Sequence, residues 1–313
     1  MIKKLSVKDY QYLIIGGTTK AATTSLFFYL KNHPRICAAN RKETRFFLDA
    51  GYPVPPGYRF EDGLDKYNQL YSCCTDMHVR MEATPDYLYS RGTPKKIQDS
   101  LPEAKIVFIL REPVSRLISW YKFAKQINDI PGKTTFEEYV DLQLKHNGKS
   151  KNKQCLLALE QGRYSTYLKQ YFELFGRDRI HVVFYEDLSN NPASVVKEIC
   201  TFANIDPTFY NNYDFKAFNR SETMRNSRIH SLYIKFRFSV RKYTSGKPYI
   251  HGILRHLKSM FEPFYLSLNT RSPENLIISP ATKDYLRDYY REEYHALEVL
   301  LGKCVPWEKG VES

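Results

Sequence analysis

A turn rich in glycine and hydroxyl residues, at residues 17–25, is the part of the chain best suited to bind an anion. It follows an apolar run at residues 12–15 and precedes an apolar helical pattern, which predicts a strand, a turn and a helix. Its spacing differs from that of a magnesium-triphosphate loop, because Ala22 and Thr23 stand where that loop needs glycine and lysine. The amides at the helix N-terminus can still bind phosphate, with Lys20 projecting over them. The turn therefore favours a phosphate or phosphosulfate bound without a metal, although a turn that binds nothing has the same pattern.

A second candidate anion ligand is Arg111, which follows a strand-like run at residues 105–110. In magnesium-dependent phosphate-loop enzymes an acidic residue at this place supports the metal. A guanidinium there binds phosphate directly, because its planar fork matches two oxygens. Pro113 opens the next helix, on which Ser115 and Ser119 lie one turn apart and share a face. We therefore expect Ser119 to bind the same phosphate as Arg111.

Glu43 is the candidate general base. It is surrounded by Arg41, Lys42 and Arg45 and is followed by an aromatic pair at residues 46–47. Neighbouring cations keep a carboxylate ionised, as it must be to take a proton from a hydroxyl or an amine. Taken alone, the segment favours a solvated turn before a strand, and Glu43 gains its candidate role only together with the other motifs.

Composition limits the class of protein. The chain has 313 residues, 42% of them hydrophobic, which suits one large α/β domain. The net charge of +13 implies an anionic partner but does not separate nucleic-acid binding from binding of a membrane surface or a phosphorylated cofactor. The longest apolar run, residues 106–110, is too short to span a membrane, and no secretory segment opens the chain, so we expect a cytoplasmic protein. Six cysteines without Cys-x-x-Cys spacing predict reduced thiols and no metal site.

Strand-like runs alternate with helical patterns, which is typical of βαβ units in a parallel sheet. The predicted strand and helix pairs are residues 12–15 with 22–31, 105–110 with 113–123, and 179–185 with 192–202. A capping box at Thr135 and Glu138 opens a further helix, and Ser279 precedes a long one that ends at Gly302. We predict one α/β domain over residues 1–313, a P-loop-NTPase-like three-layer fold with a central parallel sheet flanked by helices.

Four segments in a fixed order resemble the sulfotransferases that use 3′-phosphoadenosine 5′-phosphosulfate (PAPS): residues 17–25, 42–47, 111–121 and 184–188. The resemblance covers residues 10–308 and is nearest to the branch of bacterial and heparan sulfate sulfotransferases. It implies in-line transfer of a sulfuryl group from PAPS to a hydroxyl or amine of a small metabolite or sugar-containing acceptor. The nucleotide product is 3′-phosphoadenosine 5′-phosphate (PAP), and no metal is needed.

The resemblance also implies a donor site, with the turn on the 5′-phosphosulfate and later segments on the rest of the nucleotide. Its residues are Lys20, Ala21, Ala22, Thr23, Thr24, Ser25, Arg111, Ser119, Tyr185, Arg225 and Arg228. Arg111 and Ser119 would bind the 3′-phosphate, and Tyr185 would lie near the adenine. Arg225 and Arg228 would close over the nucleotide from a late basic loop.

Lys20 and Glu43 are the catalytic residues that the resemblance implies. Lys20 would stabilise the leaving phosphate oxygen while Glu43 takes the acceptor proton. Ala22 replaces a common glycine, which is tolerable if its backbone is helical. Ala83 replaces a lysine often seen in the heparan enzymes, and we find no membrane anchor, so both features argue against a polysaccharide acceptor.

The acceptor and its route to the site stay open. A basic aromatic insertion at about residues 228–271 is compatible with a lid, a docking face for a carrier protein, a membrane-surface helix or a helix packed on the domain. We expect a small-molecule or glycan-type acceptor, free, carrier-bound or at a membrane surface, and no nucleic acid. Two rival functions are a magnesium-dependent nucleotide kinase or NTPase, and a non-catalytic basic protein that binds polyanions. Lys20 and Arg111 oppose the first, and the second predicts salt-sensitive binding without preference for a 3′-phosphate.

Overall fold

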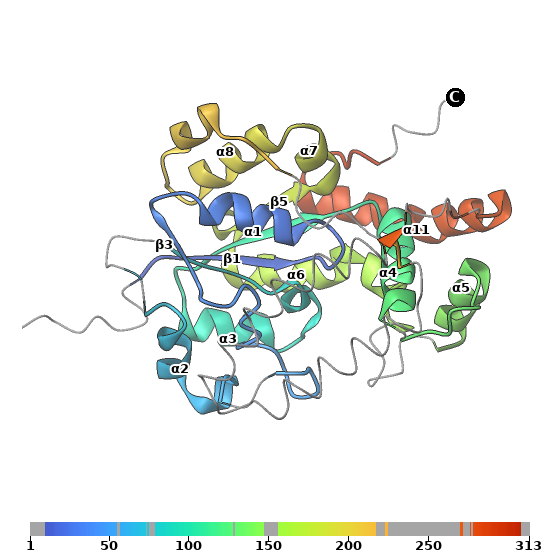
Figure 1. Ribbon diagram of the computed structural model, residues 1–313, viewed down its shortest axis with the longest axis horizontal. Coiled ribbons are helices and arrows are strands. Elements are labelled where there is room, and N and C mark those ends of the chain that lie inside the picture. The colour runs from blue at the N-terminus through green and yellow to red at the C-terminus, as the bar shows by residue number, and fades with distance from the viewer. Residues whose placement is uncertain are drawn as a thin grey trace, which may run out of the picture.

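A five-stranded parallel sheet forms the centre of the molecule, with strand order β2-β3-β1-β4-β5 (Figure 1). The computed structural model describes residues 10–54, 57–72, 74, 79–127, 129–146, 156–216, 223–224, 270–271, 276 and 278–307. The strands of the sheet are β1 (Tyr12–Gly17), β2 (Ile36–Ala38), β3 (Val79–Ala83), β4 (Lys105–Leu110) and β5 (Ile180–Phe184). Every adjacent pair runs parallel. All six residues of β1 are buried, as expected for a central strand covered on both faces.

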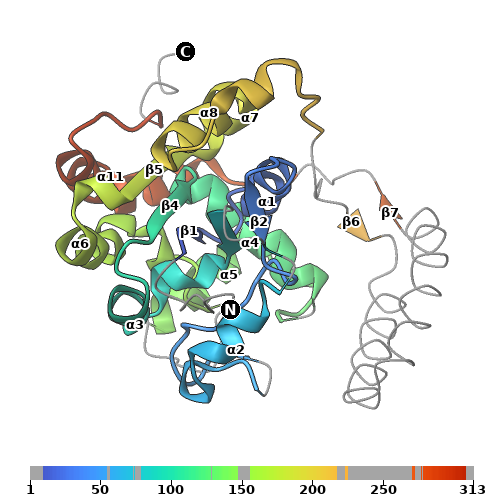
Figure 2. The ribbon, with the colours of Figure 1, turned by 90° about the vertical axis from the view of Figure 1, so that its left-hand side faces the viewer.

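Helices cover both faces of the sheet, which makes three layers (Figure 2). One face carries α1 (Thr23–Lys31), α7 (Tyr185–Asn190) and α8 (Pro192–Phe202). The other carries α3 (Thr93–Ser100), α6 (Tyr164–Phe175) and α11 (Pro280–Leu301). Along β1, Leu13 and Ile15 face the first group while Tyr12 and Ile14 face the second, which follows from the two-residue period of a strand. The predicted P-loop-like α/β fold is confirmed.

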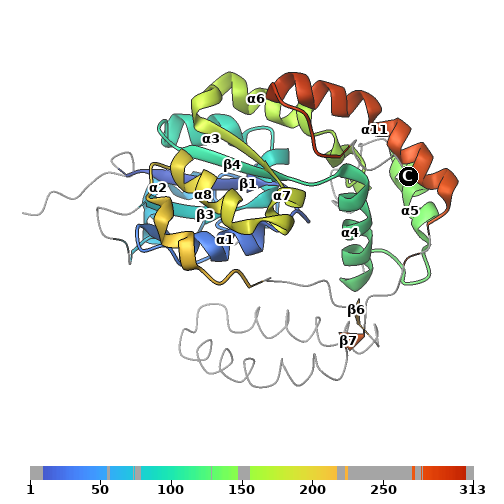
Figure 3. The same cartoon turned by 90° about the horizontal axis from the view of Figure 1, so that it is seen from above.

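The remaining elements lie around the ends of the sheet. Helix α4 (Pro113–Gln126) stands across the end to which β4 leads (Figure 3). The others are α2 (Leu64–Gln69), α5 (Phe136–His146) and the 3₁₀ turns η2 (Phe60–Asp62), η3 (Pro85–Tyr89), η5 (Glu160–Gly162), η6 (Arg177–Arg179) and η7 (Pro207–Asn212). Phe123 of α4 reaches the turn that follows β1, where its ring centre lies 4.4 Å from the Lys20 amine.

Capping side chains explain where α4, α8 and α11 begin. The Glu112 carboxylate accepts hydrogen bonds from the amides of Val114 and Ser115 at the start of α4. Asn191 caps α8 and Ser279 caps α11 in the same manner. The helix starts predicted at residues 113, 192 and 280 are therefore confirmed.

Sequence reasoning did not predict β2 or β3. Strand β3 reads Val-Arg-Met-Glu-Ala, so its charged residues conceal it from a search for apolar runs. Both of those residues are buried and have polar partners: Arg80 donates to the Tyr12 hydroxyl at 3.2 Å and to the Asn68 side-chain oxygen, and Glu82 accepts from the Tyr67 hydroxyl at 3.0 Å. Tertiary partners thus stabilise a strand that its own sequence disfavours.

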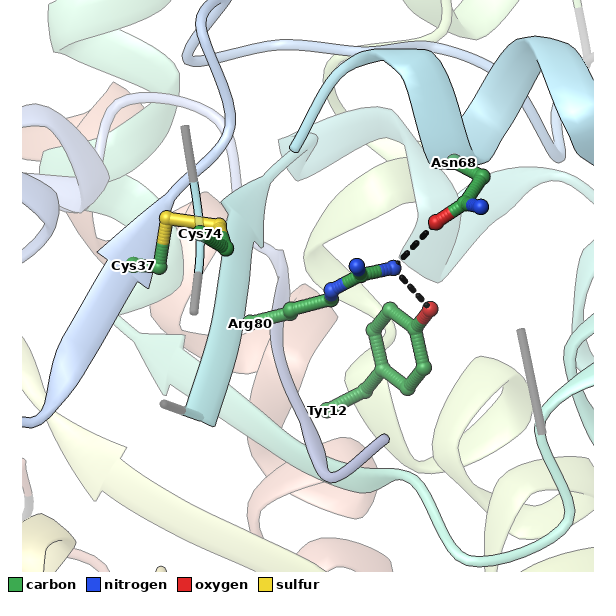
Figure 4. Close-up of a disulfide and its surroundings, with 5 residues drawn as sticks. All are labelled: Tyr12, Cys37, Asn68, Cys74 and Arg80. Atoms are coloured by element: carbon green, nitrogen blue, oxygen red, sulfur yellow. Dashed lines mark hydrogen bonds between the residues drawn. A yellow bond between two sulfur atoms is a disulfide. The ribbon is translucent and has the colours of Figure 1, made fainter. Parts of the chain in front are cut away.

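A disulfide joins Cys37 on β2 to Cys74, beyond α2, with Cα atoms 5.6 Å apart (Figure 4). The prediction of reduced thiols is wrong for this pair. The two residues are separated by 37 positions, and they meet only because β2 pairs with the edge of β3 while the segment after α2 returns to the same edge. Arg80 of β3 lies beside the bond (Figure 4). Of the other cysteines in the described ranges, Cys200 is buried, Cys304 is exposed, and both are free thiols.

Most of the predicted insertion at residues 228–271 lies outside the described residues. A short antiparallel pair, β6 (Thr223–Met224) with β7 (Thr270–Arg271), brings the two ends of the intervening segment together. The assignment of residues 1–313 to one domain remains a prediction. Within the described ranges, no helix is both long enough and apolar enough to cross a membrane.

Candidate active site

A cavity of about 910 Å³ opens at the carboxyl end of the sheet, between the segments that follow β1, β2, β3, β4 and β5. Nine of the residues predicted for the site line it: Lys20, Ala22, Thr23, Thr24, Ser25, Glu43, Arg111, Ser119 and Tyr185. Ala21 is fully buried in the core, so its backbone, and not its side chain, is the part available to a ligand. Arg225 and Arg228 lie outside the described residues. The fold therefore brings together segments that are far apart in the sequence.

The turn after β1 leaves the N-terminus of α1 available to an anion. No side chain caps this helix, so the amides of its first turn keep their hydrogen-bonding capacity, and Thr23, Thr24 and Ser25 all line the cavity. Ala22 has φ 60° and ψ 26°, which is the left-handed region. The condition that Ala22 adopt a right-handed helical backbone is therefore not met. The glycine that commonly stands here would adopt this conformation without strain.

Lys20 and Arg111 are two cations on the same wall of the cavity. Arg111 donates from Nη1 to the backbone oxygen of Lys20 at 3.2 Å, and its guanidinium lies 4.2 Å from the centre of the Tyr185 ring. The Lys20 amine lies 4.4 Å from the centre of the Phe123 ring. Burial, and then the charge of Arg111, lower the pKa of Lys20 to about 8.

Neither cation has a carboxylate within ion-pair distance among the described residues. The buried Nε of Arg111 likewise has no acceptor in that part of the chain. The site thus has two uncompensated cations beside the free amides of a helix, and one of these cations has an unused buried donor. This arrangement fits a ligand with more than one phosphate-type group.

Glu43 faces the cavity with both oxygens in ion pairs. Lys42 Nζ lies 3.3 Å from Oε1, and Arg45 Nη2 lies 2.8 Å from Oε2. Burial acts against the charged form, but Lys42 and Arg45 outweigh it and hold the pKa of Glu43 below its ordinary value. The carboxylate is therefore ionised at neutral pH, as a general base requires.

Glu82, which sequence reasoning missed, anchors the segment that carries Glu43. Its Oε2 accepts from Thr44 at 2.6 Å and from Thr84 at 2.8 Å, while the Arg45 amide donates to the Thr84 hydroxyl at 3.2 Å. Burial raises the pKa of Glu82. Two charged residues, Arg80 and Glu82, that alternate with apolar ones were the available signal, because burial of such residues requires polar partners.

The cavity also contains residues that no motif indicated. They include Tyr29, Asp86, Phe123 and Phe215. Tyr29 and Phe215 pack edge to face, with ring centres 5.0 Å apart, and add an aromatic wall beside the last turns of α1. In the described ranges, no group of three or more His, Cys, Asp or Glu side chains is placed to hold a metal ion.

A parallel five-stranded sheet, with a turn and an uncapped helix after its central strand, is a P-loop-like α/β fold. The chain matches the sulfotransferase domain family over residues 11–245, and it belongs to this family. The crystal structure of a sulfotransferase from Alicyclobacillus acidocaldarius has the same fold, with a TM-score of 0.65 and 20% identity, covering 94% of this chain and 96% of that one. The family that the sequence motifs resemble is thus confirmed.

Two curated relatives are named for heparan sulfate. Human heparan sulfate glucosamine 3-O-sulfotransferase 6 is 29% identical over 210 residues, which are 66% of this chain and 57% of that protein. Mouse bifunctional heparan sulfate N-deacetylase/N-sulfotransferase 4 is 24% identical over 205 residues, which are 64% of this chain and 23% of that protein. The chain thus spans about a quarter of one relative and slightly more than half of the other.

Proposed function

We propose that this protein transfers a sulfuryl group from PAPS to a hydroxyl or amine of a small metabolite or sugar-containing acceptor, and releases PAP. One observation carries the proposal: the uncompensated cations Lys20 and Arg111 share a cavity with the ionised carboxylate of Glu43. The two cations suit an anionic donor, and the Glu43 carboxylate can take the proton of the acceptor.

We infer the orientation of the donor from the groups that line the cavity. The first-turn amides of α1 and Lys20 suit the 5′-phosphosulfate, because they supply donors and positive charge at one place. Arg111 and Ser119 suit the 3′-phosphate, where the unpaired Nε of Arg111 offers a further donor. Tyr185, already beside the Arg111 guanidinium, lies next to this phosphate site and suits the adenine.

PAPS supplies the activated sulfuryl group, and the protein positions and stabilises the reacting atoms. Glu43 accepts the proton of the attacking hydroxyl or amine as the new bond to sulfur forms. The bond between sulfur and the bridging phosphate oxygen breaks, and that oxygen keeps the electron pair. Lys20 stabilises the charge that develops on it. Lys42 and Arg45 keep Glu43 ionised before the transfer.

A screen of acceptors with labelled PAPS tests the activity. Lys20→Ala and Glu43→Gln should each abolish transfer, whereas Lys169→Ala and Glu103→Gln, at exposed positions, should leave it unchanged. Near-normal turnover by both site variants would refute the assigned roles. Thermal stabilisation by PAP compared with AMP tests the 3′-phosphate site separately, and equal stabilisation would count against Arg111 and Ser119. Magnesium-dependent consumption of ATP would favour the kinase alternative.

The sugar-containing acceptor is supported by the names of the heparan sulfate relatives. We also propose a bacterial-type cytoplasmic enzyme that does not act on nucleic acid. The Cys37–Cys74 disulfide makes the location testable, because such bonds persist mainly in oxidising compartments. Alkylation of both thiols in intact cells would support the cytoplasm, and full protection from alkylation would refute it.

A further inference from the structure

Asp86 has no role in the chemistry described so far, although it lines the same cavity as Glu43. It belongs to the first turn of η3, directly after β3, and its side chain is half-buried. Within the described residues, no hydrogen bond or ion pair holds its carboxylate. A partly buried carboxylate without a partner, on the wall of a ligand cavity, has a hydrogen-bonding capacity that a ligand can use.

Contacts of the neighbouring residues anchor the backbone at Asp86. The Tyr171 hydroxyl donates to the backbone oxygen of Tyr87 at 2.7 Å, and the Tyr89 hydroxyl is hydrogen-bonded to Thr18 in the turn after β1. A Cβ atom at Gly17 would lie 2.8 Å from Leu88, so η3 packs directly on the end of β1. The backbone that carries Asp86 is therefore packed against the end of β1, and it places the carboxylate on the wall of the cavity that also contains Glu43.

The charges around the cavity show what kind of acceptor suits this wall. The described lining contains four cations: Lys20, Lys42, Arg45 and Arg111. Lys20 and Arg111 belong to the donor side, and the other two are already paired with Glu43. An acidic acceptor thus finds no unpaired cation among these residues, and it meets a carboxylate beside the base. A hydroxyl or ammonium group instead finds an acceptor oxygen.

We propose that Asp86 determines acceptor specificity: it accepts a hydrogen bond from a hydroxyl or ammonium group that neighbours the sulfated position, and it disfavours acceptors with a carboxylate or sulfate there. This inference rests on the proposed sulfuryl transfer, and it names a neutral or amine-bearing, hydrogen-bond-donating acceptor. Burial raises the pKa of Asp86 to about 6, against the effect of Arg45, so the side chain is mainly an ionised acceptor above neutral pH.

Binding of three matched monosaccharides to the PAP-bound protein tests this inference without a known acceptor. The probes are glucose, glucosamine and glucuronate, with affinities compared by saturation-transfer NMR. We expect wild type to prefer glucose and glucosamine over glucuronate by about ten-fold, the size of one charge-assisted hydrogen bond. Asp86→Asn should reduce this preference below about three-fold, because the charge is lost while the shape stays, and Asp86→Lys should reverse it. Asp65→Asn, at an exposed position on α2, is the matched control and should bind as wild type.

Equal affinity for the acid and the neutral sugars, no binding of any probe, or an unchanged preference in Asp86→Asn would each overturn the role of Asp86. Thermal stabilisation by PAP, measured on the same samples, tests the donor site separately from the role of Asp86. If PAP stabilises wild type and the variants equally, a failed sugar experiment refutes only the inference about Asp86. If PAP does not bind wild type, the donor site and the inference both fail.

Discussion

The affinity for PAP should fall as the pH rises through about 8, because of Lys20. Burial and the neighbouring Arg111 lower the pKa of its amine from 10.5 to about 8 in the free protein. A bound anion favours the charged amine, so binding returns the pKa toward its ordinary value and takes up a proton. Since the pKa is higher in the complex, the full affinity is present below about pH 8. It is lost progressively as the pH rises from there toward the pKa of the complex.

The pKa difference sets the magnitude. If binding restores the ordinary pKa completely, the dissociation constant rises by about 25-fold between about pH 7 and about pH 9.5. Lys20 is only partly buried, and solvent screening reduces the effect, so we expect about ten-fold. The phosphates of PAP are almost fully ionised over this range, so they add little to the slope.

Isothermal titration calorimetry at constant ionic strength measures this dependence, and repeats in buffers of different ionisation enthalpy count the protons taken up. Lys20→Arg keeps the positive charge at every pH, so it should bind PAP with no slope between about pH 7 and about pH 9.5. Lys169→Arg, at an exposed position on α6, should keep the wild-type slope. A flat profile for wild type, or an undiminished slope in Lys20→Arg, would refute the reasoning.

Two further predictions concern stability. Ala22→Gly should raise the free energy of unfolding by about 0.5–1 kcal/mol, because relief of about 1–2 kcal/mol of left-handed strain exceeds the entropic cost of glycine. Urea unfolding measures this free energy, and a clear loss of stability would contradict the strain at Ala22. Joint replacement of Cys37 and Cys74 by serine should lower the free energy of unfolding by about 4 kcal/mol, from loop closure over 37 residues. A thermal scan with and without reductant gives an independent measurement, and a loss below about 1 kcal/mol would show that the bond contributes little.

The parts of the fold that could be predicted carry local signals. β1, β4 and β5 are mainly apolar runs, and Pro113 and Pro192 mark the starts of the helices α4 and α8 that follow β4 and β5. Strands of a parallel sheet that are covered on both faces are apolar along their length, so a short stretch of sequence suffices to predict them. β2 has three residues and β3 contains Arg80 and Glu82, so neither shows an apolar run. Their place in the sheet depends on partners that lie far away along the chain.

The candidate site divides in the same way. Lys20, Arg111 and Glu43 could be chosen from residue type and spacing, because phosphate binding and proton abstraction need particular groups in particular local settings. The partners of Glu82, and the place of Asp86 beside Glu43, carried no such signal. They arise where η3 packs on the end of β1, a contact between segments about 70 residues apart.

The candidate chemistry of this protein can thus be predicted largely from its sequence. The selectivity of its cavity cannot be predicted in this way. A motif is local, because the turn after β1 and the arginine after β4 can each be recognised from a short stretch of sequence. The left-handed backbone of Ala22, the disulfide and the unpaired carboxylate of Asp86 are properties of packing. Each depends on which distant groups are neighbours, and on which of their charges are already paired.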